Sequence, residues 1–412
     1  MLYLPQYGDG LTPSDTPAQP SLVQMIALSV LVMVAFGTLF YAYSIFITQE
    51  AAGAEYSISL LSVAWTGAVL VGGGFAFVVG HTADRHGVRG IMGIGTLVGA
   101  AGLLLLGASQ NGWQLVLVSW LLIGPAGAMT FYEPAFIAVD QWFGLAGSTR
   151  SLAMLTVIGG LAGPIFIPLT GFLTVNLGWR SVASILAAVL LVTGIIATVF
   201  VFPAHMGERH EHHETAPKTG PTALLTDRRF VLFTVATLLT FMAVQALIFH
   251  RIAVFEQAGF AVTVVAAWAA VAGLMSLPGR LIAPYLSNRI RPVLVAATVT
   301  LIMGGATVLA AITVAPWQMG THFIVFGLAF GAATPMRAVV MSRWYSGPRY
   351  GAILGTQWTI VATVAAAGPL IVGLLRDGTG SYSLPMALTA ALFVVAAVLT
   401  AAAEPQAVTP GR

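Results

Sequence analysis

The feature that most constrains this chain is its series of long apolar runs. Twelve of them follow residue 21, and each is long enough to form a helix across a hydrocarbon layer of roughly 30 Å. Strands of a membrane barrel are shorter and alternate polar with apolar residues, so a barrel is excluded. We therefore predict an all-α membrane protein with twelve transmembrane helices. The expected spans are residues 22–47, 59–80, 90–108, 114–139, 151–175, 181–202, 229–255, 261–286, 292–314, 317–341, 351–375 and 383–403.

The composition agrees with a chain that is surrounded by lipid. Hydrophobic residues make up 58% of the sequence and charged residues only 8%, whereas about a quarter of a soluble protein is charged. The chain has no cysteine, which excludes disulfides and thiolate chemistry. A formal charge of +3, spread along the chain, does not indicate a nucleic-acid partner.

The polar segments divide the chain into two halves. Residues 1–21 hold four prolines and are expected to be a disordered lead-in; they lack the basic region of a cleavable signal peptide. The longest interior polar segment follows the sixth run. We therefore predict a six-helix bundle at 22–202, a cytoplasmic linker at 203–228, a second six-helix bundle at 229–403 and a tail at 404–412.

Four histidines in the linker raise the question of a metal site, because histidine binds zinc and nickel. Interspersed glutamates are more typical of a solvated linker, and no metal site or cofactor is predicted. The histidines are His205, His210, His212 and His213.

The basic residues predict the orientation. With both ends inside, twelve arginines and lysines lie in the inner loops, inner helix ends and tail, and two lie in the outer loops. Cytoplasmic loops carry the excess of positive charge. We therefore expect a multi-pass protein of the cell (inner) membrane with both termini in the cytoplasm.

A repeat at half the chain length indicates a transporter built from two similar halves. Asp84-Arg85, in the segment GHTADRHGVRG, is echoed by Asn288-Arg289, in PGRLIAPYLSNRIRP; the two lie 204 residues apart (288 − 84) in a chain of 412. The copies differ at one informative position, because the second has Arg280 where the first has Ala76 (280 − 204). An arginine inside a membrane helix usually faces a cavity or a partner.

The first of these segments resembles the signature between helices 2 and 3 of the major facilitator superfamily, G-x-x-x-D-R-x-G-x-R. The matching residues are Gly80, Asp84, Arg85, Gly87 and Arg89. The resemblance covers nearly the whole chain and implies two pseudo-symmetric six-helix bundles that work by alternating access. It also implies a gate, with Asp84 accepting from backbone donors at a helix start or pairing with an arginine across the inner face. An ordinary polar turn is the alternative.

The gate would close the cytoplasmic side of an outward-open state. Asn288 and Arg289 are the corresponding gating candidates of the second half.

Within the superfamily, four places are similar to the monocarboxylate and oxalate–formate group. They are Trp142-Phe143 with Arg150–Ala153 and Gly159-Gly160, the loop Leu177–Arg180, the ending Gly373–Tyr382, and Gly279-Arg280. The last implies that Arg280 pairs with a substrate carboxylate. The chain departs from the group at helix 1, which reads Ala35–Leu39 without an acid or a lysine, and at Ser276, where an acid would be expected.

Arg280 and Glu133 are the main candidates for chemistry. Arg280 lies nine residues from Arg289, about 13 Å of helix rise, and its guanidinium offers planar, bidentate donors to an anion. Glu133 lies at a similar depth in the fourth span, next to Pro134, which frees a backbone carbonyl. Apolar surroundings favour a protonated carboxyl.

We expect Glu133 to pair with Arg280 when ionised and to release it to the substrate when protonated, so that one proton moves with one anion. A permanent structural ion pair is the alternative, and an arginine held against carbonyls or an acid is the alternative for Arg280 itself.

The remaining candidates are less specific. His250 could relay protons or gate the outer mouth, and Arg251 could attract anions; an interfacial anchor pair is the alternative. Arg337, one and a half turns from Arg343, is expected to extend to the inner face, with substrate binding as the alternative. Residues that could line a substrate pocket are Tyr41, Tyr132, Gln357 and Trp358.

The sequence contains no phosphate-binding loop and no nucleophile–base constellation, so it predicts neither an ATP-driven pump nor an enzyme. It favours a secondary transporter of a small organic anion, monocarboxylate-like, moved with a proton. The partners expected are the substrate, the proton and the lipid bilayer, with no nucleic acid and no obligate protein. The alternatives are efflux of a drug-like or neutral solute and, in another class, a membrane sensor without flux.

Overall fold

A computed structural model describes residues 21–46, 52, 55–203 and 224–404. Within these ranges twelve helical segments are long and apolar enough to cross a membrane. The predicted all-α membrane fold with twelve spans is therefore confirmed. The lead-in, most of the linker with its four histidines, and the tail lie outside the described residues.

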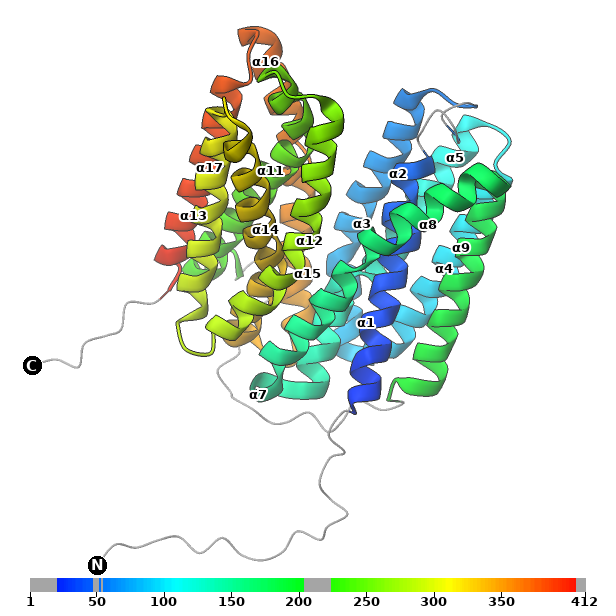
Figure 1. The fold of residues 1–412 in the computed structure, drawn as a ribbon. Coiled ribbons are helices and arrows are strands. Elements are labelled where there is room, and N and C mark those ends of the chain that lie inside the picture. The colour runs from blue at the N-terminus through cyan, green and yellow to red at the C-terminus, as the bar shows by residue number, and fades with distance from the viewer. Residues whose placement is uncertain (1–20, 47–51, 53–54, 204–223, 405–412) are drawn as a thin grey trace, which may run out of the picture.

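The first six spans form one bundle, which we call the N half (Figure 1). Its elements are α1 (Leu22–Phe36), η1 (Gly37–Tyr41), α2 (Ala42–Phe46), α3 (Ile58–His86), α4 (Val88–Ala108), α5 (Gly112–Val118), η3 (Ser119–Ile123), α6 (Gly124–Thr130), α7 (Tyr132–Gly160), α8 (Ala162–Leu177), α9 (Trp179–Ile195) and η4 (Ile196–Val201).

The last six spans form the second bundle, the C half, which lies on the left in Figure 1. Its elements are α11 (Arg228–Gln257), α12 (Val262–Leu286), α13 (Pro292–Ala311), α14 (Pro316–Tyr345), α15 (Tyr350–Ala365), α16 (Gly368–Thr379) and α17 (Ser383–Ala402). We call the end at which α1 begins and α17 ends the inner end.

The two halves meet mainly through α3 and α15, with further contacts of α7 to α12 and α14. Small residues allow the close approach of α3 and α15. A Cβ added at Gly80 would overlap the carbonyl oxygen of Gly351, and one added at Gly355 would overlap that of Ala76. Without a hydrophobic force between helices in lipid, such backbone contact is a main source of helix association.

The helix that carries the loop signature is longer than predicted. The apolar run was expected to end at residue 80, but α3 continues to His86. Asp84 of its last turn lies at the contact with α15, where its carboxylate accepts from the backbone N–H groups of Gly351 and Ala352, while Arg85 and His86 are exposed. Gly87 then turns the chain into α4 with a φ of 75°, a left-handed conformation that favours glycine.

Several spans depart from a regular α-helix. The fourth span contains a π-helical segment, η3, and then breaks at Phe131, whose backbone is extended. The first span contains the π-helical segment η1, and the eleventh is divided between α15 and α16. Such segments in membrane helices leave backbone groups free and are common at functional sites. The break at Phe131 starts α7 at the centre of the protein, directly before Glu133 and Pro134.

Candidate site at the interface of the two halves

The centre of the interface contains a buried ion pair. The Arg337 Nη1 atom donates to Glu133 Oε1 at 2.8 Å and Nη2 donates to Oε2 at 3.3 Å, in the two-pronged geometry that suits a guanidinium and a carboxylate. Arg337 is 3% exposed and Glu133 6% exposed. The pair joins α14 of the C half to the first turn of α7 in the N half.

Two residues of α15 hold the guanidinium of Arg337 in place. Its Nε donates to Gln357 Oε1 at 2.9 Å, and its Cζ lies 4.7 Å from the ring centroid of Trp358. Phe241 of α11 packs edge-on against Trp358 at 5.3 Å. Gln357 is fully buried, so it positions Arg337, while Trp358 is half-buried beside it.

These contacts correct two expectations from the sequence. Glu133 was expected to pair with Arg280, but its partner is Arg337. Arg337 was expected to extend to the inner face, but its side chain turns into the interface. The reason is that α14 packs against α7 along the interface, so the side chain of Arg337 lies beside the first turn of α7, where the Glu133 carboxylate accepts from it.

The two residues of the ion pair are separated in the sequence by the same number of residues as the two copies of the repeat. Glu133 and Arg337 are 204 residues apart, as are Asp84 and Asn288 (288 − 84). They lie in the fourth and the tenth spans, which correspond to each other in two six-helix halves. The ion pair therefore joins equivalent positions, and applying the repeat spacing to Glu133 would have found Arg337 from the sequence.

Arg280 lies at a second point of the interface and has a different environment. Its Nη1 donates to Tyr132 Oη at 3.2 Å and to the carbonyl oxygen of Thr156 at 2.9 Å. Its Nε is buried without a hydrogen-bond partner, and no described residue accepts from Nη2. The side chain is 9% exposed, and no acid lies within ion-pair distance among the described residues.

One edge of this guanidinium is therefore unpaired, and its Nε is enclosed beside Gly160. The Nε and Nη2 donors lie on the same side of the group and together match the two oxygens of a carboxylate. A buried cation without a counter-ion is unfavourable in a membrane protein. The site can be satisfied by an anion that enters from outside the chain.

Two glycines make room for this arrangement. A Cβ at Gly160 would come 2.8 Å from Arg280 Nε, and one at Gly159 would come 2.7 Å from Tyr132 Oη. Tyr41 lies against Gly163 and interacts electrostatically with Arg280 and Tyr132. The sequence analysis gave these glycines no role of their own, because glycine is common in packed membrane helices.

The break before α7 explains how one short segment serves both arginines. Tyr132 and Glu133 are consecutive residues of the first helical turn, and their side chains reach Arg280 and Arg337 respectively. The negative charge of Glu133 also lies at a helix N-terminus, where the helix dipole stabilises it. The predicted pocket residues thus separate into one group around Arg280 and one around Arg337.

Asp84 connects the halves at the inner end. Its Oδ1 accepts from the backbone N–H of Gly351 and its Oδ2 from that of Ala352, both at 2.8 Å. These donors belong to the first turn of α15, where N–H groups have no partner within the helix. Of the two arrangements considered from the sequence, this is the contact with backbone donors at a helix start.

The other signature residues have local roles. Arg89 donates from Nε to the carbonyl oxygen of Thr198 at 2.6 Å and from Nη2 to that of Val199 at 3.0 Å, which caps the end of the sixth span. Arg85 is exposed.

In the second half, Arg289 packs on Tyr285, four residues before it in the chain. The structure therefore does not place Asn288 and Arg289 in an inter-half contact like that of Asp84, and their gating role remains a prediction.

A second acid at the inner end was missed by the sequence analysis. Asp140 of α7 accepts from the hydroxyl of Ser346 at 2.6 Å, from that of Ser342 at 3.2 Å and from the N–H of Gly347 at 3.4 Å. It links the N half to the end of α14. Because it is only three residues from Phe143, the sequence gives no sign that it faces the other bundle rather than water.

His250 lies away from both arginine groups, in the outer part of α11. Its Nε2 is 2.9 Å from the carbonyl oxygen of Pro369, and its Nδ1 is 3.2 Å from Tyr382 Oη. A carbonyl can only accept, so Nε2 carries a hydrogen, and in the neutral imidazole the tyrosine donates to Nδ1. The structure does not bring His250 together with Glu133.

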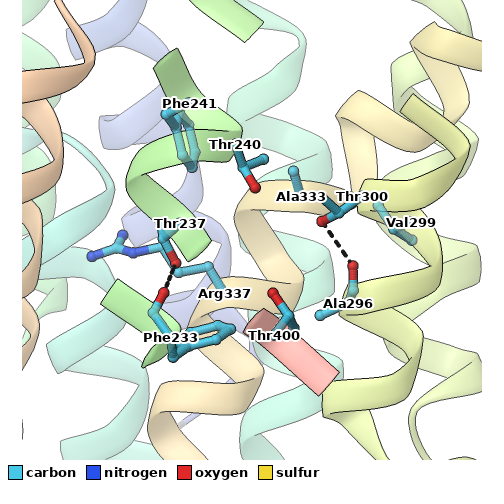
Figure 2. A pocket seen from close by; sticks show the side chains of 10 residues that line it. All are labelled: Phe233, Thr237, Thr240, Phe241, Ala296, Val299, Thr300, Ala333, Arg337 and Thr400. Carbon is cyan, nitrogen blue, oxygen red and sulfur yellow. Dashed lines mark hydrogen bonds between the residues drawn. The ribbon is translucent and has the colours of Figure 1, made fainter. Parts of the chain in front are cut away.

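A small polar cavity lies inside the C half, behind Arg337 (Figure 2). About 30 Å³ of it is open to water, and its walls include Thr237, Thr240, Thr300 and Thr400. The stem of Arg337 lines it, while Figure 2 shows the guanidinium pointing away from Thr300 and Thr400. The cavity is large enough for water but far smaller than an ordinary ligand pocket. It is therefore too small to be the substrate site.

The fold of two six-helix halves agrees with the family that comparison with known proteins finds. The profile of the Major Facilitator Superfamily matches residues 25–336, and the chain belongs to this superfamily. It is therefore a secondary transporter and not an enzyme, and its substrate is a small molecule.

Named relatives are distant. The chain is 27% identical over 309 residues to monocarboxylate transporter 13 of Rattus norvegicus, a match that covers 73% of this chain and 70% of the relative. It is 23% identical over 394 residues to the agnestins efflux protein AgnL12 of Paecilomyces divaricatus, which covers 92% of this chain and 86% of the relative.

Solved structures share the fold. The human organic anion transporter MFSD10 superposes with a TM-score of 0.72 at 16% identity, over 93% of this chain and 100% of the other. The transporter FucP in the outward conformation superposes with a TM-score of 0.75 at 13% identity, over 93% of this chain and 99% of the other.

Proposed function

We propose that this chain moves a small organic anion, a monocarboxylate, together with a proton by alternating access. The observation that supports the anion is the free Nε–Nη2 edge of Arg280 at the interface of the halves. The names of two relatives, monocarboxylate transporter 13 and monocarboxylate transporter 3 of Rattus norvegicus, agree with this substrate class.

The charges of the interface favour one anionic substrate. Away from Asp84 at the inner end, the interface holds two buried guanidiniums, Arg280 and Arg337, and one buried carboxylate, Glu133, which is already paired with Arg337. One positive charge is left over. A substrate carboxylate on Arg280 makes the centre neutral, and a neutral solute does not.

Glu133 is the proposed proton carrier, now through Arg337. When Glu133 takes up a proton, Arg337 loses its negative partner and the interface holds two uncompensated cations. The attraction for an anion then increases, since charges in a buried site interact strongly. Proton and anion therefore each increase the affinity for the other, and this reciprocal coupling favours their movement together. Gln357 and Trp358 keep Arg337 in position while its partner changes.

The inner gate is proposed to consist of Asp84 with the start of α15, supported by Asp140 with the end of α14. Both contacts join the two halves at the inner end, so both must break for the site to open there. The arginine and lysine distribution supports an orientation with this end, and both termini, in the cytoplasm of a cell with the protein in its inner membrane.

Uptake by purified protein in lipid vesicles tests the proposal. Inward flux of radiolabelled carboxylates is measured with and without an inward proton gradient. We expect stimulation by the gradient, loss of flux in Arg280→Ala, and flux without gradient dependence in Glu133→Gln. Arg376→Ala, an exposed arginine at the outer end of α16, is the matched control and should keep full flux. Unchanged gradient dependence in Glu133→Gln would exclude its proton role.

Efflux of a less polar solute is the second candidate. It is favoured by the relative named as an efflux protein, whose match covers 92% of this chain. In the same vesicles, flux of neutral analogues that survives Arg280→Ala would support it and assign Arg280 to the scaffold.

A further inference from the structure

Aromatic rings extend outward from the Arg280 site along the N half. Tyr132, which accepts from Arg280, lies 4.8 Å from Phe36 between ring centroids, and Phe36 stacks on Phe131 at 4.1 Å. Phe40, one turn further along the first span, lies 5.9 Å from Phe36 and 4.9 Å from Trp65 of α3. We call Tyr132, Phe36, Phe131, Phe40 and Trp65 the aromatic ladder.

The ladder is incompletely covered. Phe40 is 36% exposed although it lies within a span and has rings as neighbours. The other four rings are half-buried. Phe40 contacts Trp65 on α3 and Phe131 directly before α7, and both α3 and α7 pack against the C half. The exposed ring therefore lies beside two elements that pack against the other half.

The position of Tyr132 sets the spacing between the charged and the apolar part of this site. The same side chain bonds to the guanidinium through its oxygen and contacts the first phenylalanine through its ring. A ligand that places its carboxylate on Arg280 and its body along Tyr132 would reach the ring of Phe36. Acetate or a similar acid would leave this ring uncovered.

We propose that the aromatic ladder binds the apolar body of the substrate, and that the substrate is a monocarboxylate with an aromatic ring. This rests on the proposed function, because Arg280 must hold the carboxylate. An aromatic body matches the ladder better than an aliphatic one, because rings gain from edge-to-face and offset stacking beyond the area that they bury. Phe40 is the specificity-determining residue, and Tyr132 connects the two parts of the site.

Equilibrium binding to the purified full-length protein tests this subsite. The probes are phenylacetate, acetate and cyclohexylacetate, of which the last has a ring of similar size without π electrons. In the unchanged protein, phenylacetate should bind at least about tenfold more tightly than acetate, from the burial of one ring. Cyclohexylacetate should lie between them.

Phe40→Leu keeps an apolar side chain and removes the ring. It should reduce the phenylacetate-to-acetate preference by about fivefold and leave acetate binding unchanged. Phe172→Leu is the matched control, since Phe172 lies in the same half and is 68% exposed; it should leave the preference unchanged. Phe131→Leu provides a second ladder variant, and thermal unfolding of each variant verifies that it is folded.

The outcomes separate the subsite from the anion site. An unchanged preference in Phe40→Leu and Phe131→Leu would overturn the aromatic ladder as a binding site, even if Arg280→Ala abolishes binding of every acid. Equal affinity for cyclohexylacetate and phenylacetate would overturn the aromatic substrate. Carboxylate binding that survives Arg280→Ala, or is absent from the unchanged protein, would instead refute the proposed function, and with it the subsite that depends on it.

Discussion

Replacing Asp84 by asparagine is expected to open the inner end of the protein. The carboxylate accepts two backbone hydrogen bonds of 2.8 Å from the first turn of α15, and the two groups belong to different halves. In the proposed gate, these bonds must break when the inner end opens. Removing them therefore destabilises the closed state relative to the open one.

The size of the effect follows from the geometry. A hydrogen bond to a charged group contributes about 1.5–3 kcal/mol, and a negative charge at a helix N-terminus adds about 0.3–1 kcal/mol. Asparagine keeps one acceptor oxygen but turns an amide donor toward the second N–H, so one bond and the charge are lost. The closed state loses about 2–4 kcal/mol, which is roughly a 30- to 700-fold change in the ratio of open to closed protein.

Labelling of an introduced cysteine measures this ratio, since the chain has no cysteine of its own. Ala76 of α3 is 2% exposed, and its carbonyl lies against Gly355 of α15, so Ala76→Cys should react with a polar maleimide only when the halves separate. Asp84→Asn should raise the labelling rate at least about tenfold. The control is Asp377→Asn, an exposed acid that pairs with its neighbour Arg376. A labelling rate within twofold of the parent, in a folded Asp84→Asn protein, would refute the gate.

Three further predictions concern the interface. Asp140→Asn should raise labelling of the same cysteine less than Asp84→Asn does, because only one of its three inter-half bonds is shorter than 3 Å; an equal or larger rise would contradict this ranking. Arg337→Gln should lower the thermal unfolding temperature, measured by tryptophan fluorescence, because it leaves the buried Glu133 unpaired at a cost of about 3–5 kcal/mol. The double variant Glu133→Gln with Arg337→Gln should regain most of this stability. A double variant that is no more stable than Arg337→Gln would argue against the pair. Gly160→Ala should weaken carboxylate binding about tenfold, because its Cβ would come 2.8 Å from Arg280 Nε, whereas Gly171→Ala, whose Cβ would meet nothing within 4 Å, should not.

The architecture of this protein can be predicted from its sequence because lipid imposes a simple rule. A helix must be long and apolar enough to satisfy its own backbone across the membrane, so the twelve spans are visible as runs. The repeat of Asp84 and Asn288 then divides them into halves. The interruptions at η1, η3 and Phe131 are not visible, because they depend on packing against neighbouring helices rather than on a local signal.

The site could be predicted only in part, and the reason is geometric. Depth along a helix can be counted from the sequence, so Arg280 and Glu133 were found. The sequence does not give the relative orientation of the two bundles. It therefore does not show which side chains of one bundle meet those of the other. The sequence therefore assigned Glu133 to the wrong arginine and sent Arg337 to the inner surface. Gln357 and Trp358 were expected to line the substrate pocket; the structure shows their contacts with Arg337, and their role toward the substrate stays a prediction.

The equivalence of Glu133 and Arg337 has a consequence for how the two halves can assemble. In a pair of identical half-proteins, equivalent positions on the symmetry axis would carry the same residue, and the interface would hold two glutamates or two arginines. Either like-charged pair, buried from water, would repel. The interface is neutral at this position only when one half carries the glutamate and the other carries the arginine. The ion pair is therefore a specificity determinant of the interface. It disfavours association of two identical halves and favours the pairing of the two different halves that this chain joins.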